Sequence, residues 1–571
     1  MAFQISPGVN VSEVDATTIV PSVLTTAGAF AGRFAWGPAN KVIRITNENS
    51  LVQTFGKPDI NTYVSFFTAA SFLAYGNNLQ TVRALGPNTY NAIANNSTSQ
   101  IQIENEDVFE TAYLNNTNNS NELGSFAAKY PGVLGNSLTV SVVDNAADYA
   151  NWEVNGIGVK NYFTGAPSTS AQGEAAGATD DEMHIIVTDS GGLFTGIKNS
   201  VLEVFPYVSK ALDATDSLGN SNFYKYVLYK NSKYIYAVDS VDYANTSSTW
   251  GNTLAGTEFA VLDGAQTVTL SNGADSALET GSFEIAYDAF SSVETIDISL
   301  VLTGGAGVTT QQYIIDNIAN TRKDCVAFIS PPSDAVINQP GLESANIIEW
   351  LSELSRSSSY VMADSGWKYM FDKYNNTYRW VPLNGDIAGL CVSTDNIADP
   401  WFSPAGLNRG NLKNVIKLAW NPNKSFRDAI YSVGVNPVIS MPGTGTVLYG
   451  DKTLQTKPSA FDRINVRRLF IVLEKSIAQA SKYSLFEFND EFSRAQFVAL
   501  VTPFLRDVQG RRGIYDFRVV CDTTNNTPEV IDGNRFVGDI YVKPSRSINF
   551  IQLNFVAVRT GVDFTEIVGK F

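Results

Sequence analysis

The run CVAFI at residues 325–329 is a short apolar segment followed by Pro331 and Pro332, and it decides the fold class. A run of this length bounded by prolines predicts a buried strand. Residues 311–322 before it and 342–356 after it place apolar side chains at helical spacing, and residues 359–363 predict a second buried strand. Strands that alternate with helices in this way predict an α/β core with a parallel sheet.

The same core is expected to draw on the N-terminal part of the chain, where residues 63–75 predict a helix and 79–85 a strand. An acidic segment separates the two parts. Residues 91–300 hold 26 Asp and Glu against seven Lys and no Arg, in a chain whose net charge is -16. Ten Asn between positions 88 and 121 favour turns at the left boundary of this segment. The composition therefore predicts a separate, solvent-facing insertion.

Short β-like runs recur within the insertion, at residues 137–143, 183–187 and 225–238. Turn residues separate these runs, which predicts β-rich protruding domains. The Ala, Gly and Thr residues of 165–179 predict a mobile loop tip.

The C-terminal part predicts an α+β domain. Ser459 is placed to cap a helix that continues over residues 464–482, and a second helix is expected over 491–509. Arg463, Arg467, Arg468 and Lys475 fall outside the apolar stripe of the first helix, so we expect exposed charges there. Strands are expected at 514–520, 536–543 and 550–558.

The predicted fold class is thus a multidomain chain of mixed α+β and α/β type, with a core from its N- and C-terminal parts and a β-rich protruding insertion. The expected divisions are an arm at 1–20, core at 21–90, insertion at 91–300, α/β core at 301–450 and the C-terminal domain at 451–571.

The sequence offers few candidate catalytic or metal-binding residues. The single histidine, His184, lies in a strand-like run without a second metal ligand nearby, so we interpret it as structural. Cys325, Cys391 and Cys521 are too far apart in sequence for a metal knuckle or a disulfide framework and are expected as buried thiols. Phosphate-loop, nucleophile-elbow and zinc-protease motifs are missing, and no run approaches the roughly 20 apolar residues that a membrane span needs. We therefore expect no enzyme activity, no cofactor, no metal and no membrane insertion.

Several motifs at both ends resemble one family, the contractile tail sheath proteins of large phages, and T-even-like phages most closely. The N-terminal motifs are Pro7-Gly8-Val9, the run GRFAWGPAN at 32–40 and FGKP at 55–58. The C-terminal motifs are SAFDRINVRRL at 459–469, FEFND at 486–490 and Cys521-Asp522. The resemblance covers roughly residues 1–90 and 301–571, and it leaves the insertion without a match.

The resemblance implies a structural subunit that polymerises in stacked hexameric rings and contracts, driven by stored interface energy. Implied partners are further copies of the chain, a tail tube protein, and baseplate and tail terminator proteins, without direct nucleic-acid contact. The implied place is the virion, after synthesis and assembly in the host cytoplasm.

The resemblance also implies that N- and C-terminal strands are donated into the C-terminal sheet of a neighbouring subunit. The implied inter-subunit residues are Val9, Val11, Ile551, Leu553, Phe555, Val562 and Phe564, without a decision on which C-terminal run is donated. The four cations Arg463, Arg467, Arg468 and Lys475 are the expected tube-facing residues.

Three alternatives stay open at this point. Both terminal strands can fold back onto their own sheet. The chain can instead be the sheath of a bacterial contractile injection system. From a different class, it can be a phage protein that binds or degrades glycans through the acidic and aromatic residues of 91–300.

Overall fold

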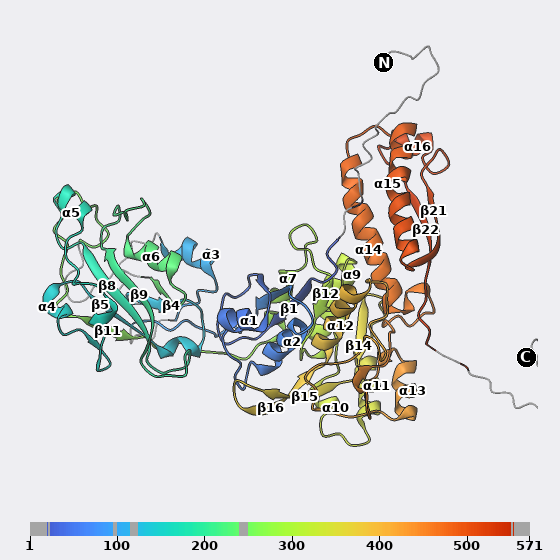
Figure 1. The fold of residues 1–571 in the computed structure, drawn as a ribbon, viewed down its shortest axis with the longest axis horizontal. Coiled ribbons are helices and arrows are strands. Elements are labelled where there is room, and N and C mark those ends of the chain that lie inside the picture. Colours follow the sequence, from blue (N-terminus) through green and yellow to red (C-terminus); the bar gives the residue numbers. More distant parts are fainter. Residues whose placement is uncertain are drawn as a thin grey trace, which may run out of the picture.

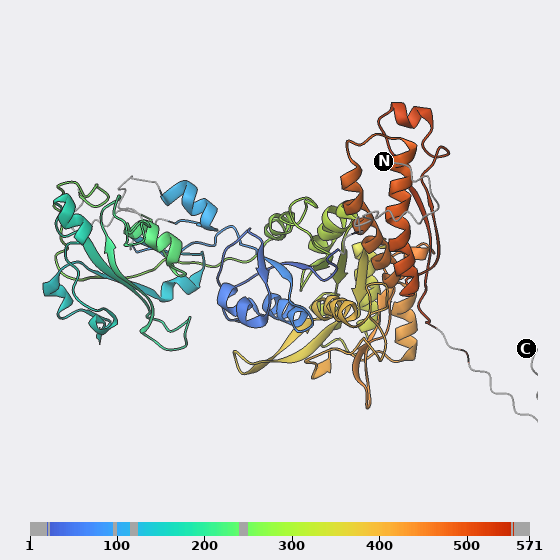
Figure 2. The same cartoon turned by 45° about the horizontal axis from the view of Figure 1, so that its top comes forward.

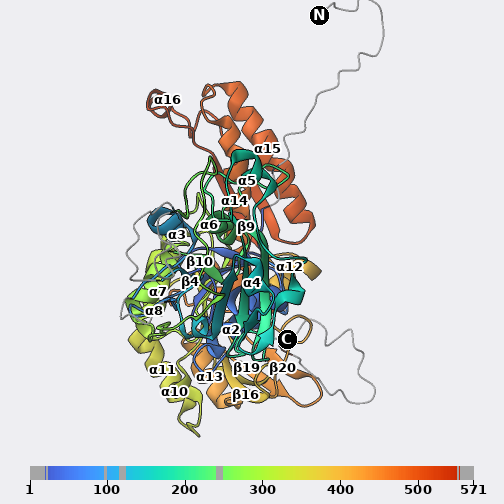
Figure 3. The same ribbon diagram turned by 90° about the vertical axis from the view of Figure 1, so that its left-hand side faces the viewer.

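The computed structural model describes residues 20, 23–94, 100–114, 124–238, 249–549 and 552. Figure 1 shows three parts along the long axis: an outlying β-rich part, a central α/β part, and a C-terminal part with two long helices. The tilted view keeps the three parts apart (Figure 2), and the view along the long axis places the outlying part in front of the core (Figure 3).

The central part is built on a seven-stranded sheet in the order β18-β14-β13-β12-β1-β3-β2. All pairs are parallel except β2 with β3. Strand β1 pairs on one side with β3 and on the other with β12, so residues from before and after the insertion are neighbours in the sheet. The strands are β1 (Gly28–Gly32), β2 (Ile43–Ile45), β3 (Leu79–Arg83), β12 (Leu300–Leu302), β13 (Val326–Ile329), β14 (Val361–Asp364) and β18 (Val435–Asn436).

Helices cover both faces of this sheet, which explains why its strands are nearly continuous apolar runs. Phe30, Leu302 and Phe328 point to one face, where α2 and α12 pack, and their neighbours Ala31, Val301 and Ala327 point to the other. The first face holds α1 (Glu48–Phe55), α2 (Tyr63–Leu73) and α12 (Asn384–Ile397). The second holds α7 (Thr280–Asp288), α8 (Val308–Tyr313), the π-helical turn Ile314–Ala319 and α11 (Glu343–Leu354).

Smaller elements complete the central part. A three-stranded antiparallel sheet has the order β16-β15-β17, and β19 pairs with β20 in a hairpin. The bounds are α9 (Asn320–Arg322), α10 (Ser333–Val336), β15 (Trp367–Asp372), β16 (Thr377–Pro382), β17 (Lys417–Leu418), α13 (Lys424–Ser432), β19 (Val438–Met441) and β20 (Gly445–Leu448). The predicted α/β core is therefore confirmed.

The outlying part contains an antiparallel sheet in the order β11-β5-β8-β9 and the pairs β4-β10 and β6-β7. Its hydrophobic clusters are separate from those of the central sheet, with Trp36 as the one contribution from before the insertion among the described residues. The strands are β4 (Phe126–Ala128), β5 (Leu138–Val143), β6 (Glu153–Val154), β7 (Ile157–Gly158), β8 (Glu182–Asp189), β9 (Ser200–Ser209), β10 (Ile235–Ala237) and β11 (Gln266–Thr269). The helices are α3 (Glu106–Phe109), α4 (Ala146–Tyr149), α5 (Ala171–Ala176) and α6 (Tyr224–Asn231).

Two expectations for the insertion are wrong. Residues 225–238 are not one extended run, because Tyr224–Asn231 forms a helix that buries Tyr224 and Leu228, and only Ile235–Ala237 is a strand. The expected loop tip at 165–179 contains helix α5, which Ser170 caps by accepting from the Gly173 amide. Asp181 holds that cap through the Ser170 amide and hydroxyl at 2.7 and 2.8 Å. Tertiary contacts decide the secondary structure of both segments, and the local composition does not reveal these contacts.

The last part of the acidic segment packs on the central sheet. Helix α7 packs on the central sheet through Ala286 and Tyr287, and Phe290 and Ile298 belong to the same cluster. The Tyr287 hydroxyl donates to the carbonyl of Leu302 at 2.6 Å. We therefore propose that the insertion ends near residue 277 and that the last part of the acidic segment belongs to the core.

The contacts that join the insertion to the core include those of Trp36 and Arg83. Trp36 packs edge-on against Tyr130 and Phe194, with ring centroids 5.4 and 5.0 Å away. The buried guanidinium of Arg83 donates to the carbonyls of Phe34, Gly37 and Pro131 at 3.0, 2.9 and 2.7 Å. Because these contacts bridge the insertion and the core, they fix the orientation of the insertion relative to the core.

His184 is buried inside the outlying part. Its Nδ1 accepts from the Tyr207 amide at 3.0 Å, and its Nε2 donates to the Gly165 carbonyl at 2.8 Å. The ring stacks on Phe163 with centroids 4.3 Å apart. These bonds require the neutral ring, and burial lowers the pKa of His184 below its ordinary 6.5. The structural interpretation of this histidine agrees with the contacts.

We predict that the outlying part loses stability in acid because of His184. Below about pH 6.5 the unfolded chain binds a proton that the folded ring does not, so stability falls by at most about 1.4 kcal/mol per pH unit. The contribution is fully present above pH 6.5. Thermal unfolding at pH 7.5 and 5.5 should show a smaller pH-dependent drop for His184→Gln than for the unmodified chain. Equal drops in both proteins would contradict this assignment.

Candidate functional site: an open strand edge in the C-terminal domain

The C-terminal domain consists of two long helices and a two-stranded sheet. Helix α14 (Ile464–Ser481) follows a short 3-10 turn at Ala460–Asp462, and α15 (Glu491–Gly510) starts where Asp490 accepts from the Ser493 amide. Ser459 caps the 3-10 turn rather than α14, because Arg463 is extended between them. The sheet pairs β21 (Ile514–Val520) with β22 (Asp539–Pro544), and the short helix α16 (Pro528–Asp532) lies between these strands in sequence.

The sheet lies on the helix pair. Phe517, Val519, Ile540 and Val542 face a cluster with Leu473 of α14 and the apolar face of α15. In the described part of the chain, β21 is the one strand that pairs with β22. The other edge of β22 therefore leaves backbone groups open to a further strand, which is the geometry for β-augmentation.

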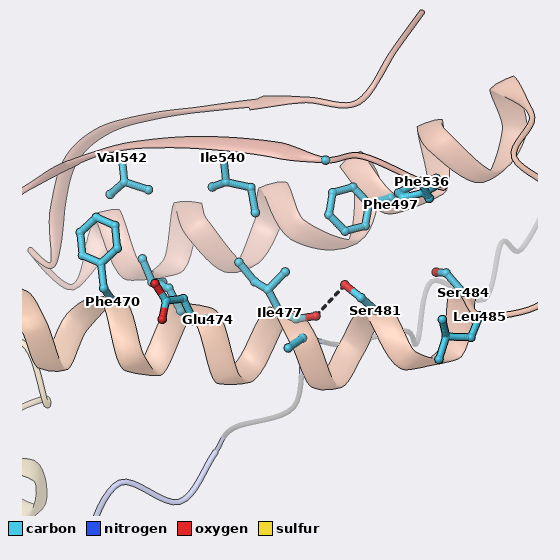
Figure 4. Close-up of a pocket in the computed structure, with 13 residues that line it drawn as sticks. Phe470, Glu474, Ile477, Ser481, Ser484, Leu485, Phe497, Phe536, Ile540 and Val542 are labelled. Atoms are coloured by element: carbon cyan, nitrogen blue, oxygen red, sulfur yellow. Dashed lines mark hydrogen bonds between the residues drawn. The ribbon is translucent and has the colours of Figure 1, made fainter. Parts of the chain in front are cut away.

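A groove of about 530 Å³ runs along this open edge, between β22 and α14. Figure 4 shows Val542 and Ile540 on the strand side, opposite Phe470, Glu474 and Ile477 of the helix. Phe536, Phe497 and Leu485 line the other end of the groove. Because the lining is mostly apolar, the groove suits alternate apolar side chains of an added strand.

Three polar side chains line the groove, those of Glu474, Ser481 and Ser484. Ser481 satisfies its hydroxyl by donating to the Ile477 carbonyl at 2.7 Å (Figure 4). Burial raises the pKa of Glu474 above its ordinary range, while Arg467 and Lys323 act in the opposite direction.

An exposed apolar loop continues the groove between α14 and α15. Its large side chains are each at least 63% exposed, an unusual density for a monomer. Leu485 belongs both to this loop and to the groove lining. The exposed residues are Tyr483, Leu485, Phe486 and Phe488 of the loop and Phe492 in the first turn of α15.

The four cations expected to face a tube are bound within the chain. Arg468, 4% exposed, makes a bidentate pair with Asp395 of α12 at 2.8 and 2.6 Å. Arg467 is 5% exposed. Its guanidinium lies 4.1 Å from the ring centroid of Tyr360 and 3.9 Å from that of Phe461.

The other two cations also face the core. Lys475 reaches Asp297 at 2.8 Å and the Ile298 carbonyl at 2.7 Å, and Arg463 lies 3.6 Å from Asp451. The expectation of exposed charges is therefore wrong for Arg467 and Arg468, and a tube-facing role cannot rest on these two buried side chains. The physical reason is that their partners come from elements 70 or more residues away in sequence.

The expected inter-subunit residues all lie outside the described residues. They are Val9, Val11, Ile551, Leu553, Phe555, Val562 and Phe564. The three cysteines are buried and free, as expected. Over the described ranges, no group of three or more His, Cys, Asp or Glu is arranged to hold a metal ion, and no helix is long and apolar enough to cross a membrane.

The groove was not among the sequence expectations. The apolar stripe of the helix expected over 464–482 runs through Leu469, Phe470, Leu473 and Ile477. Phe470 is only partly buried and lines the groove. The available signal for the groove was the width of this apolar stripe, which is more than a two-stranded sheet can cover.

Three family models match the chain: the phage tail sheath C-terminal domain at residues 456–557, the phage tail sheath protein central domain at 286–454, and the tail sheath protein Gp18 domain III N-terminal region at 26–84. These matches lie on both sides of the outlying part.

Curated relatives match the chain over its full length. A tail sheath protein of Vibrio phage KVP40 is 33% identical over 99% of this chain and 100% of that protein. The tail sheath protein of Enterobacteria phage T4 is 32% identical over 99% of both chains.

Solved structures share the fold at low identity. The sheath tail protein of Listeria innocua has a TM-score of 0.53 at 11% identity, over 92% of this chain and 96% of that one. The helical sheath of the anti-feeding prophage in its contracted state has a TM-score of 0.51 at 12% identity, over 97% and 99%. The full-length relatives and the family models show that the chain belongs to the family of contractile phage tail sheath proteins.

Proposed function

We propose that copies of this chain polymerise by strand donation into the groove beside β22, in stacked six-membered rings around a tail tube. The observation that carries this proposal is the open edge of β22 above an apolar groove of about 530 Å³. An added strand would satisfy the edge with main-chain hydrogen bonds and fill the groove with every second side chain. The alternating residues Val9 and Val11 at one end and Ile551, Leu553 and Phe555 at the other suit this role.

In the proposed mechanism, the extended lattice is kinetically trapped, and a baseplate signal lets subunits slide into a shorter lattice with better interfaces. The C-terminal domain and the core would move as one body, since Arg468 and Lys475 tie α14 to Asp395 and Asp297. Donated strands would keep neighbours linked during the movement. This function needs no catalytic site, and we propose that the chain acts without one.

The tube, the baseplate and a tail terminator are the proposed partners in the virion, with assembly in the host cytoplasm. Support comes from the family, because a solved relative by fold is a helical sheath. No membrane contact is part of the proposal.

Filling the groove should block assembly, and the residue for this test is Ala478, an exposed position of α14 in the groove lining. Ala478→Trp puts an indole where the added strand would lie, and we expect electron microscopy to show folded protein without striated tubes. Gln479→Trp is the matched control, because Gln479 is also exposed on α14 but does not line the groove. Normal tubes from Ala478→Trp would exclude this groove as the acceptor.

A further inference from the structure

Three arginines lie at one end of the groove beside β22. Arg409, Arg512 and Arg546 line a pocket of about 770 Å³, which we call the arginine pocket. Arg409 donates from Nε to the Ser403 carbonyl at 2.9 Å, and Arg512 and Arg546 are exposed. The pocket therefore presents a concentration of positive charge to solvent.

The one carboxylate in this pocket is already engaged. Asp451 accepts from the hydroxyls of Ser403 and Ser547 at 3.0 and 2.6 Å and from the Asn549 amide at 2.9 Å. Arg463, which does not line the pocket, lies 3.6 Å from the same carboxylate. The three lining arginines are thus not neutralised by Asp451, and the pocket suits an incoming acidic group.

The arginine pocket shares no lining residue with the groove, but it is lined by residues that follow β22 and begin α14, the two elements that wall the groove. Arg546 follows Val542 by four residues, which is about 13 Å of extended chain. Asn465, at the start of α14, also lines the pocket and donates to the Ser545 carbonyl at 3.3 Å, about 7.5 Å along the helix before Phe470. An extended segment that leaves the groove past Val542 therefore reaches the arginines.

The opposite end of the groove carries more acidic than basic side chains. The apolar loop there contains Glu487 and Asp490, and Glu491 follows at the start of α15; all three are exposed. Asn489 of the same loop donates to the Arg535 carbonyl at 2.8 Å, which places Arg535 beside these carboxylates. This end does not favour an acidic occupant.

The N-terminal arm has a matching pattern in its sequence. Residues 1–32 contain no Lys or Arg, and their acidic residues are Glu13 and Asp15. In an extended chain, every second residue faces the same way, so Val9, Val11, Glu13 and Asp15 share one face. Asp15 follows Val11 by four residues, the same spacing that separates Arg546 from Val542.

We propose that the N-terminal arm of a second copy lies parallel to β22, with Val9 and Val11 in the groove and Glu13 and Asp15 at the arginine pocket. The proposal rests on the strand donation proposed above and adds the direction and the register of the donated strand. The apolar half of the arm face meets the apolar groove, and the acidic half meets the cations. The reverse direction would place both carboxylates beside Glu487, Asp490 and Glu491.

Disulfide trapping tests the direction. Chains with Asp15→Cys are mixed in equal amounts with chains carrying Arg546→Cys, so that any disulfide between them is intermolecular. The native cysteines are buried and contribute little background. We expect a cross-linked dimer on non-reducing gels under assembly conditions. Arg535→Cys in place of Arg546→Cys is the matched control at the other groove end and should give at least tenfold less dimer.

The outcomes separate the two levels of the proposal. Cross-linking through Arg535→Cys instead of Arg546→Cys would overturn the parallel direction and leave strand donation intact. Tubes that form without either cross-link would overturn both, because the arm would then not lie in the groove of a neighbour.

Charge reversal gives a second test in the full chain. Arg546→Glu should raise the critical concentration for polymerisation about tenfold at low salt, and Asp15→Lys in the same chain should restore most of it. Arg535→Glu is the control and should change the critical concentration less than twofold. Because Arg546 is exposed, the effect should shrink at high salt. No effect of Arg546→Glu, or no rescue by Asp15→Lys, would contradict the assigned register.

Discussion

Chains that lack residues 1–19 or 550–571 should remain folded monomers and fail to form tubes at concentrations where the full chain assembles completely. The hydrophobic clusters of the described residues are built from Ala29 to Val542, and we expect these clusters to hold the fold without either end. Two apolar side chains that leave the groove cost about 1.5 kcal/mol each, or about 100-fold in the critical concentration. Sedimentation and electron microscopy measure assembly, and circular dichroism measures folding.

A second pair of variants tests whether assembly needs the apolar side chains of the arm and not only its length. Val9→Ser with Val11→Ser keeps the length but removes the apolar face, and it should raise the critical concentration strongly. Asn10→Ser with Ser12→Ala changes the opposite face of the extended arm and should have little effect. Regular tubes from the chain that lacks residues 1–19 would show that donation through this end is not needed.

Arg468→Met should destabilise the docking of the C-terminal domain on the core by about 3–5 kcal/mol. Both side chains of the Arg468–Asp395 pair are 4% exposed, so the substitution leaves a buried carboxylate without its cation. The hydroxyl of Thr25 still donates to Asp395 at 2.7 Å, which is too little to compensate for the lost charge. Differential scanning calorimetry should show an earlier transition for the C-terminal part.

Two further variants test the mechanism behind this loss. Arg468→Met combined with Asp395→Leu removes both charges, and it should recover most of the stability of the unmodified chain. Arg518→Met, on the exposed face of β21, should stay within about 0.5 kcal/mol of it. A single Arg468→Met variant as stable as the Arg518→Met control would show that the ion pair does not hold the domain.

The local sequence pattern was sufficient to predict a helix or strand where that element buries one clear apolar stripe or run. The strand predicted at 514–520 coincides with β21, and the helix predicted at 491–509 ends one residue before α15 does. Buried parallel strands such as Val326–Ile329 are continuous apolar runs whatever their neighbours are, so the sequence predicts them directly. The run at 225–238 was misread because alternating aromatic and polar residues fit a strand and a short helix equally well.

The sequence by itself determined the fold class, the acidic and separate character of the insertion, and the family, because local periodicity, composition and motifs are written along the chain. Only the tertiary structure decided what the cations of α14 do, since Asp395, Asp297 and Asp451 reach them from distant elements. The open edge of β22 also became visible only there. An unpaired edge is a property of how strands are arranged in space, and the same six residues of β22 would read identically in the middle of a sheet.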